Sequence, residues 1–100
     1  MLYVKVSGQP PSVTIALAGE LDMVSTQTLN TAIKELDKDM IERITICLSK
    51  LQFIDSSGIG QLISLYRALK VRGIKFRVEN NNREIEEVLE LIGLREIIEE

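Results

Sequence analysis

One hundred residues are enough for one compact domain, and we expect residues 1–100 to form it. Fifteen acidic and twelve basic side chains give a net charge of −3. This balance argues against nucleic acid or an anionic membrane surface as the main partner, since both require a cationic face. The chain has no histidine, which excludes a Ser-His-Asp triad, a His-ligated zinc and a His phosphocarrier.

Two β-strands are predicted at the start of the chain. Residues 2–6 are β-branched and aromatic and lead into a turn that contains Gly8, Pro10 and Pro11. Residues 13–18 place apolar side chains at a period of two, as a strand does. The two segments are therefore expected to form an antiparallel hairpin, which residues 19–22 end.

A helix and a third strand follow. From Ser25 onward, the apolar residues recur at spacings of four, three and four, which predicts one helix face made of Leu29, Ile33, Leu36 and Met40. Ser25 or Asp22 is the expected cap at the start of this helix. Residues 44–48 are nearly all apolar, which is typical of a strand covered on both faces.

The rest of the chain continues the alternation of helix and strand. A second helix is predicted with an apolar stripe made of Ile59, Leu62, Ile63, Tyr66 and Leu69 and an end at Gly73. Residues 74–79 alternate as a strand, and residues 80–82 are expected to form a turn and cap. A third helix carries Ile85, Val88, Leu89 and Ile92 and ends at Gly93, and the apolar tail beyond it is expected to pack on the domain.

The predicted order β-β-α-β-α-β-α indicates an α/β fold, with helices packed against a four-stranded mixed sheet. Strand-helix-strand units give parallel strands with right-handed crossovers, so the loops after the second and third strands leave from the same edge of the sheet. Those loops carry Asp22 and Asp55-Ser56. We therefore expect these residues to lie together, although more than thirty residues separate them in the sequence.

The apolar runs are far shorter than the roughly 20 residues of a membrane helix, and no secretory signal precedes the first strand. The single cysteine, Cys47, excludes an internal disulfide. We therefore expect a cytoplasmic protein with no membrane segment.

The segment Asp-Ser-Ser-Gly-Ile-Gly at residues 55–60 is the most informative in the chain. A helix cap by Asp55 or a serine accounts for one polar residue but not for Gly58 and Gly60, since glycine costs about 0.5–1 kcal/mol inside a helix. Glycines are tolerated there when another surface approaches the backbone closely. A serine at a helix N-terminus also suits a phosphate, because the helix dipole and free N–H groups favour negative charge. We therefore predict a functional role for this segment.

Enzymatic interpretations of the same segment fit poorly. A dinucleotide fingerprint would need glycine at position 63, which is Ile63, and no lysine follows the glycines as in a P-loop. A nucleophilic serine would lack its histidine base. Asp22 and Glu20 could form half of a carboxylate pair or metal site, but a capping role for Asp22, with a secondary place in a binding surface, is favoured. No enzyme, cofactor or metal site is predicted.

Taken together, these residues resemble the STAS domain family, and within it the bacterial anti-sigma factor antagonists. The resemblance covers nearly the whole chain and is carried by residues 18–22, 48–58 and 91–94. The Asp-Ser-Ser-Gly element in this order of strands and helices is its specific part. This chain departs from many relatives at Cys47 and Met23, where a polar residue is common.

The resemblance implies that Ser56 is phosphorylated by a partner that is both an anti-sigma factor and a serine kinase. The unphosphorylated antagonist would bind that partner and free a sigma factor, and a serine phosphatase acting on phosphorylated Ser56 would reverse the modification. The partner-binding residues would then be Asp22, Asp55, Ser56, Ser57, Gly58 and Gly60. The chain is accordingly expected to be a monomeric, non-enzymatic phosphorylation switch.

Two alternatives remain open from the residues. One is a STAS scaffold, or a subunit of a stress-signalling or lipid-transport complex, that uses the same surface constitutively. The other is a small hydrolase or nucleotide binder built on residues 55–60.

Overall fold

The computed structural model describes residues 1–79 and 83–91, except for the side chains of Val88, Leu89 and Leu91. Its sheet has the order β1-β2-β3-β4, with β1 antiparallel to β2 and the other pairs parallel. The strands are β1 (Leu2–Gln9), β2 (Ser12–Leu21), β3 (Arg43–Ile54) and β4 (Lys75–Glu79). The helices are α1 (Thr26–Lys34), a 3-10 turn η1 (Lys38–Met40), α2 (Ser56–Val71) and α3 (Arg83–Leu91). The predicted α/β fold and element order are confirmed.

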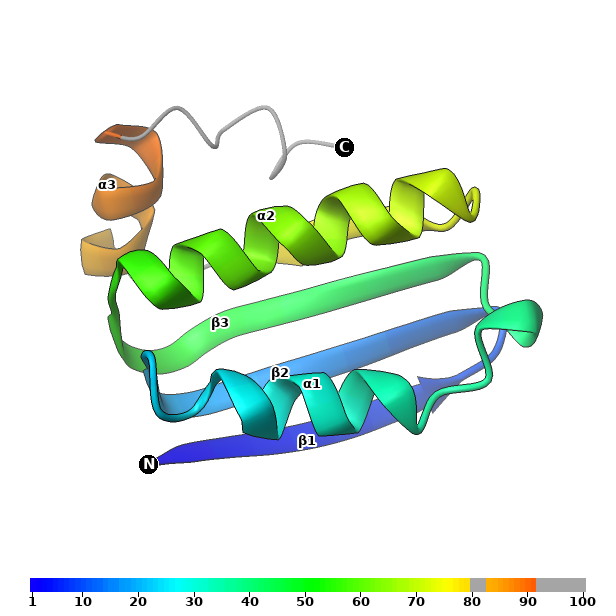
Figure 1. The fold of residues 1–100 in the computed structure, drawn as a ribbon, viewed down its shortest axis with the longest axis horizontal. Coiled ribbons are helices and arrows are strands. Elements are labelled where there is room, and N and C mark those ends of the chain that lie inside the picture. The colour runs from blue at the N-terminus through cyan, green and yellow to red at the C-terminus, as the bar shows by residue number, and fades with distance from the viewer. Residues whose placement is uncertain (80–82, 92–100) are drawn as a thin grey trace.

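Helices α1 and α2 lie side by side on one face of the sheet, and both begin at the same end of it (Figure 1). α1 contacts β1, while α2 contacts β3 and β4. α3 contacts β3, near the end of the sheet where α2 begins. The right-handed crossovers thus bring the starts of both long helices to the carboxyl edge of the parallel strands.

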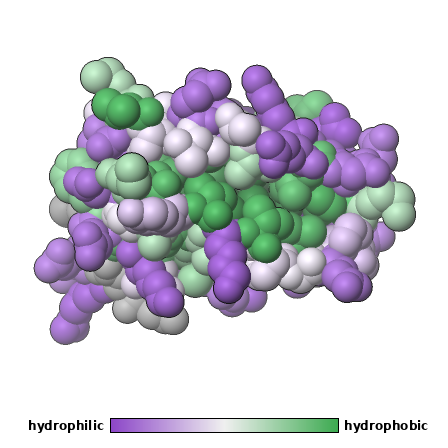
Figure 2. Space-filling view, turned by 90° about the horizontal axis from the view of Figure 1, so that it is seen from below, coloured by the Kyte–Doolittle hydropathy of each residue, from purple (hydrophilic) through white to green (hydrophobic). Residues whose placement is uncertain are grey.

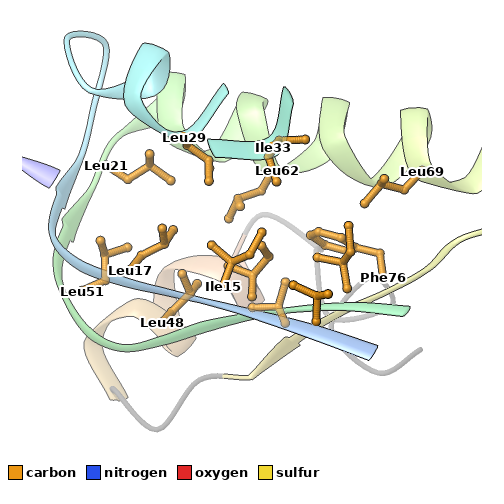
Figure 3. Packing of buried hydrophobic residues seen from close by; sticks show 14 of the residues in the cluster. Ile15, Leu17, Leu21, Leu29, Ile33, Leu48, Leu51, Leu62, Leu69 and Phe76 are labelled. Carbon is orange, nitrogen blue, oxygen red and sulfur yellow. The ribbon is translucent and has the colours of Figure 1, made fainter. Parts of the chain in front are cut away.

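The core fills the space between these two helices and the sheet. Alternate residues of β2 and β3, such as Ile15, Leu17 and Leu48, point from the strands toward Leu29 and Leu62 on the helices (Figure 3). All five are at most 3% exposed. This burial is the main source of stability, because apolar area removed from water contributes about 25 cal/mol per Å².

One aromatic pair joins α2 to β4. Tyr66 is half-buried on α2, and its ring packs edge-to-face on Phe76, with 6.0 Å between the ring centroids. The prediction that Tyr66 belongs to the apolar stripe of this helix is confirmed.

The first helix is shorter than its apolar spacing predicts. α1 ends at Lys34, and Met40 lies in η1 with its side chain 61% exposed. The Asp37 side chain accepts a hydrogen bond from the Asp39 N–H and so caps the 3-10 turn, while the Lys38 ammonium donates to the Ile33 carbonyl oxygen at 2.9 Å. These local side-chain bonds compete with continuation of the helix. The predicted helix is therefore wrong beyond Lys34 and the predicted face is wrong at Met40, while Leu36 still packs against the core from outside the helix.

The third strand is longer than predicted, because β3 continues past Leu48 to Ile54. The pairing of β2 with β3 has two register shifts, one between Ala16 and Ala18 and one between Gly19 and Glu20. At each shift, β3 has one residue more than β2. Such bulges interrupt the alternation of buried and exposed residues that identifies a strand. β2 likewise runs through residues 19–21, where the sequence predicts its end.

Several predictions fall on residues that lie outside the described part of the chain. These are the turn at residues 80–82, the contribution of Ile92 to the third helix, the end of that helix at Gly93 and the packing of the tail. Within the described part, Ile85 of α3 is buried, as its place on the predicted apolar stripe requires.

Seen from the side of β1 and α1, the molecule shows an apolar band with hydrophilic side chains on both sides of it (Figure 2). β1 is the edge strand on this side and leaves Val6 44% exposed.

No helix among the described residues has the length and apolar character that crossing a bilayer requires.

Candidate functional site

The candidate site is formed at the carboxyl edge of β2 and β3. Leu21 and Ile54 are register partners at the ends of these strands, so Asp22 and Asp55 follow directly from paired residues. The Asp55 N–H donates to the Leu21 carbonyl oxygen at 3.2 Å, which joins the two loops. The structure therefore brings together the segments that strand topology predicts to meet.

Asp55 caps α2 and presents Ser56 as the first residue of the helix. One carboxylate oxygen of Asp55 accepts the Gly58 N–H at 3.0 Å, and its carbonyl oxygen accepts the Ile59 N–H at 3.0 Å. Ser56 is exposed, whereas Ser57 is half-buried and faces the groove between α1 and α2. Of the two adjacent serines, Ser56 is thus the more accessible to another protein.

Gly58 is buried, and packing within the chain accounts for it. A Cβ at this position would lie 2.5 Å from the Leu21 carbonyl oxygen and 2.9 Å from the Ile54 side chain. The surface that approaches this glycine therefore belongs to the chain itself, at the ends of β2 and β3. Gly58 supports the site by letting the two loops meet.

Asp22 organises the tight turn between β2 and α1. One of its carboxylate oxygens accepts the N–H groups of Ser25 at 3.0 Å and Val24 at 3.1 Å. The Ser25 hydroxyl accepts the Asp22 N–H at 2.9 Å and donates to the Glu20 carbonyl oxygen at 2.8 Å. The hydrogen bonds from the Ser25 backbone and hydroxyl, followed by the one from Val24, lower the pKa of Asp22 below its ordinary value.

The capping role predicted for Asp22 or Ser25 takes a different form in the structure. Ser25 occupies the N-cap position of α1 but makes no side-chain capping bond. Its side chain instead fixes the turn that precedes the helix, together with Asp22. This turn holds Met23 and Val24 outward, with 73% and 84% of their surface exposed.

The family model of the STAS domain matches residues 3–100. The chain belongs to the STAS domain family. It is 25% identical over 98 residues to the anti-sigma-B factor antagonist of Bacillus subtilis strain 168, which covers 98% of this chain and 89% of that protein.

Solved structures agree on the fold. An anti-sigma factor antagonist from Mycobacterium paratuberculosis superposes with a TM-score of 0.85 at 24% identity, covering 99% of this chain and 84% of that one. SpoIIAA matches in its unphosphorylated form with a TM-score of 0.71 at 22% identity, covering 89% of this chain and 83% of that one. The phosphorylated form of SpoIIAA from Bacillus matches with a TM-score of 0.74 at 22% identity, covering 96% of this chain and 88% of that one.

The STAS domain of this chain also links its two long helices through Gln61, a residue that the sequence analysis missed. The Gln61 side-chain amide donates to the Thr26 carbonyl oxygen at 2.6 Å and to the Asn30 side-chain oxygen at 2.9 Å. Gln61 lies on the groove side of α2, next to Gly60. The signal in the sequence was weak, because a lone glutamine on a helix is usually solvated.

Electrostatics distinguish the site edge of this STAS domain. Residues 6–33 and 51–66 contain neither lysine nor arginine, so neither loop supplies a cationic side chain to Glu20, Asp22 and Asp55. Glu20 pairs instead with the N-terminal ammonium of Met1 at 3.0 Å. Within the described residues, no group of three or more acidic or cysteine side chains is placed to hold a metal ion. What the edge offers is an accessible serine at a helix N-terminus, next to the carboxylate that caps the helix.

Proposed function

We propose that this chain is an anti-sigma factor antagonist controlled by phosphorylation of Ser56. In its unphosphorylated form it binds an anti-sigma factor with serine-kinase activity, which releases a sigma factor. Phosphorylation by that kinase ends binding, and a serine phosphatase restores it. The binding surface contains Asp22, Asp55, Ser56, Ser57 and Gly60, with Gly58 supporting it from below.

The observation that carries this proposal is the exposed Ser56 hydroxyl at the first position of α2. A helix N-terminus accommodates a phosphate, because its first N–H groups lack partners inside the helix and its dipole is positive there. The relatives in the family that are anti-sigma factor antagonists support the same interpretation.

Phosphorylation would act on the complex through charge. A phosphoserine adds about −1.5 to −2 charges at neutral pH. Asp22 and Asp55 are already at this edge, and neither loop supplies a lysine or arginine to pair with the phosphate. A partner packed over Ser56 would have to bury an unpaired dianion, which costs several kcal/mol.

The direct test is mass spectrometry of the chain after incubation with ATP and the kinase-type anti-sigma factor encoded in the same genome. We expect one phosphate on the wild type and on Ser57→Ala, and none on Ser56→Ala. Modification at another residue, or an unmodified wild-type chain, would contradict the phosphorylation switch.

Binding supplies the second test. By calorimetry against the same anti-sigma factor, Ser56→Ala should bind like the wild type. Ser56→Asp should fold but bind more weakly, because a single charge imitates the phosphate in part. Equal affinities of the two variants would rule out the charge mechanism.

A further inference from the structure

An open groove runs between α1 and α2 beside the candidate site. Its volume is about 570 Å³, and its lining includes Leu29, Ile33 and Leu65 at the base. Met23 and Ser57 line it as well, so the groove continues from the edge that carries Ser56. Since α1 and α2 start at the same end of the sheet (Figure 1), the groove leads from their N-termini toward the C-terminus of α1.

Gly60 opens the α2 side of this groove. A Cβ at this position would meet no atom within 4 Å, in contrast to Gly58 two residues earlier. Glycine weakens a helix, and no neighbour inside the chain requires it here. Its effect is to leave space in the groove at the helix turn that follows Ser56 and Ser57.

The charges along the groove indicate the chemistry of its occupant. Among the described residues that line it, the charged side chains are Lys34 and Lys38, near the C-terminal end of α1. They are cations on a chain whose net charge is −3. The polar side chains of Asn30 and Gln61 also line the groove, but they are already bonded to each other. The occupant that complements the rest of the lining is mainly apolar and carries carboxylates at the lysine end.

We infer that this groove receives an apolar and acidic segment of the anti-sigma factor, with Met23 as part of its rim. The inference rests on the proposed function and specifies where the partner docks. A segment seated in the groove lies against Ser57 and Gly60, so its apolar end would cover the neighbouring Ser56 position, where an unpaired phosphate would be costly to bury. The groove thereby couples docking to the phosphorylation state.

Gly60→Leu tests the inference by filling the groove without disturbing the core. Leucine favours a helix more than glycine does, and its Cβ enters open space, so the melting temperature should not fall. The affinity for the purified anti-sigma factor should fall by at least about tenfold, because a leucine side chain occupies the docking volume. Arg67→Leu, an exposed change on α2 that does not line the groove, is the matched control and should stay within about twofold of the wild type.

A charge reversal gives an independent measurement. Lys34→Glu should weaken binding about threefold or more and flatten its dependence on salt, since it places a carboxylate opposite the acidic segment. Lys5→Glu, an equal change in net charge on exposed β1, should leave affinity and salt dependence unchanged.

The possible outcomes distinguish failure of the groove inference from failure of the proposed function. If the wild type binds the anti-sigma factor and Gly60→Leu and Lys34→Glu bind equally well, the groove inference is overturned while the proposed function stands. If the wild type does not bind, the proposed function fails and the inference with it. A wild-type dimer in light scattering that Gly60→Leu abolishes would assign the groove to a second copy and overturn the inference.

Discussion

At the scale of single residues, the aspartates of the two site loops have different structural roles. Asp55 caps a helix through the Gly58 N–H, whereas Asp22 holds a turn through the N–H groups of Val24 and Ser25. Both carboxylates stabilise backbone at the site edge, so replacing either one alters loop structure as well as surface charge.

Asp22→Asn tests this account of the turn. The pKa of Asp22 is lowered in the folded state, so its ionised form stabilises the fold above the ordinary pKa of aspartate, and this contribution is lost as the pH falls through the folded value. At pH 7 we expect the variant to melt at a lower temperature than the wild type, with the difference disappearing at acidic pH, below about 4.

Thermal unfolding followed by circular dichroism between pH 7 and the acid range provides the measurement. Glu87→Gln, on the exposed surface of α3, controls for the loss of one negative charge. Melting temperatures of the wild type and Asp22→Asn that stay equally far apart at every pH would show that the carboxylate bonds of the turn are not responsible.

At the scale of elements, the start of α2 contains two glycines whose surroundings differ in the space they leave for a side chain. Gly58 is fixed by contact with Leu21 and Ile54, while Gly60 faces open space. Sequence reasoning treated both as places where an external surface approaches. That interpretation is wrong for Gly58, since the surface over it belongs to the chain itself, and it stays a prediction for Gly60.

Alanine at each glycine should therefore give stability changes of opposite sign. Gly58→Ala should destabilise the domain by about 1–3 kcal/mol, because the added Cβ overlaps backbone that cannot move freely. Gly60→Ala should stabilise it by about 0.5–1 kcal/mol through the better helix propensity of alanine. Urea unfolding of both variants measures the difference, and two changes of the same sign would contradict the assigned packing.

The sequence was most informative where periodicity was undisturbed. Strand and helix order, and the meeting of Asp22 with the Asp55 loop, followed from alternation and crossover topology. The end of β3 was missed because two bulges shift its register, and the end of α1 because Asp37 and Lys38 make local bonds that compete with the helix. Ser25 and Gln61 were missed as links because their partners, Glu20 and Thr26, are fixed only by the tertiary arrangement.

At the scale of the whole molecule, the proposed switch surface and the stabilising core are separate. Ser56 is exposed at one edge, while the buried side chains lie between the sheet and the two helices (Figure 3). Val71, at the C-terminal end of α2, and Met40, in η1, also expose apolar surface, but neither lines the groove at the site. A change of charge at Ser56 can thus alter a contact surface without entering the core.

Phosphorylation of Ser56 should accordingly leave the fold intact. The N-terminus of α2 favours the added negative charge, whereas Asp22 and Asp55 oppose it, so the two effects partly offset each other. SpoIIAA has this fold in both its unphosphorylated and phosphorylated forms. For the present chain we expect the melting temperature to move by less than about 5 °C, which corresponds to less than about 1 kcal/mol for a domain of this size.

Amide hydrogen exchange on the purified phosphorylated and unphosphorylated chains locates any change. Peptides from β2 and β3 should keep their protection, because their hydrogen bonds open only with the core, and differences should be confined to the Asp22 turn and the start of α2. Loss of protection across the whole sheet would show that phosphorylation acts by unfolding the domain. If the phosphate acts by its charge at the contact surface, the sheet keeps its protection while binding to the anti-sigma factor is lost.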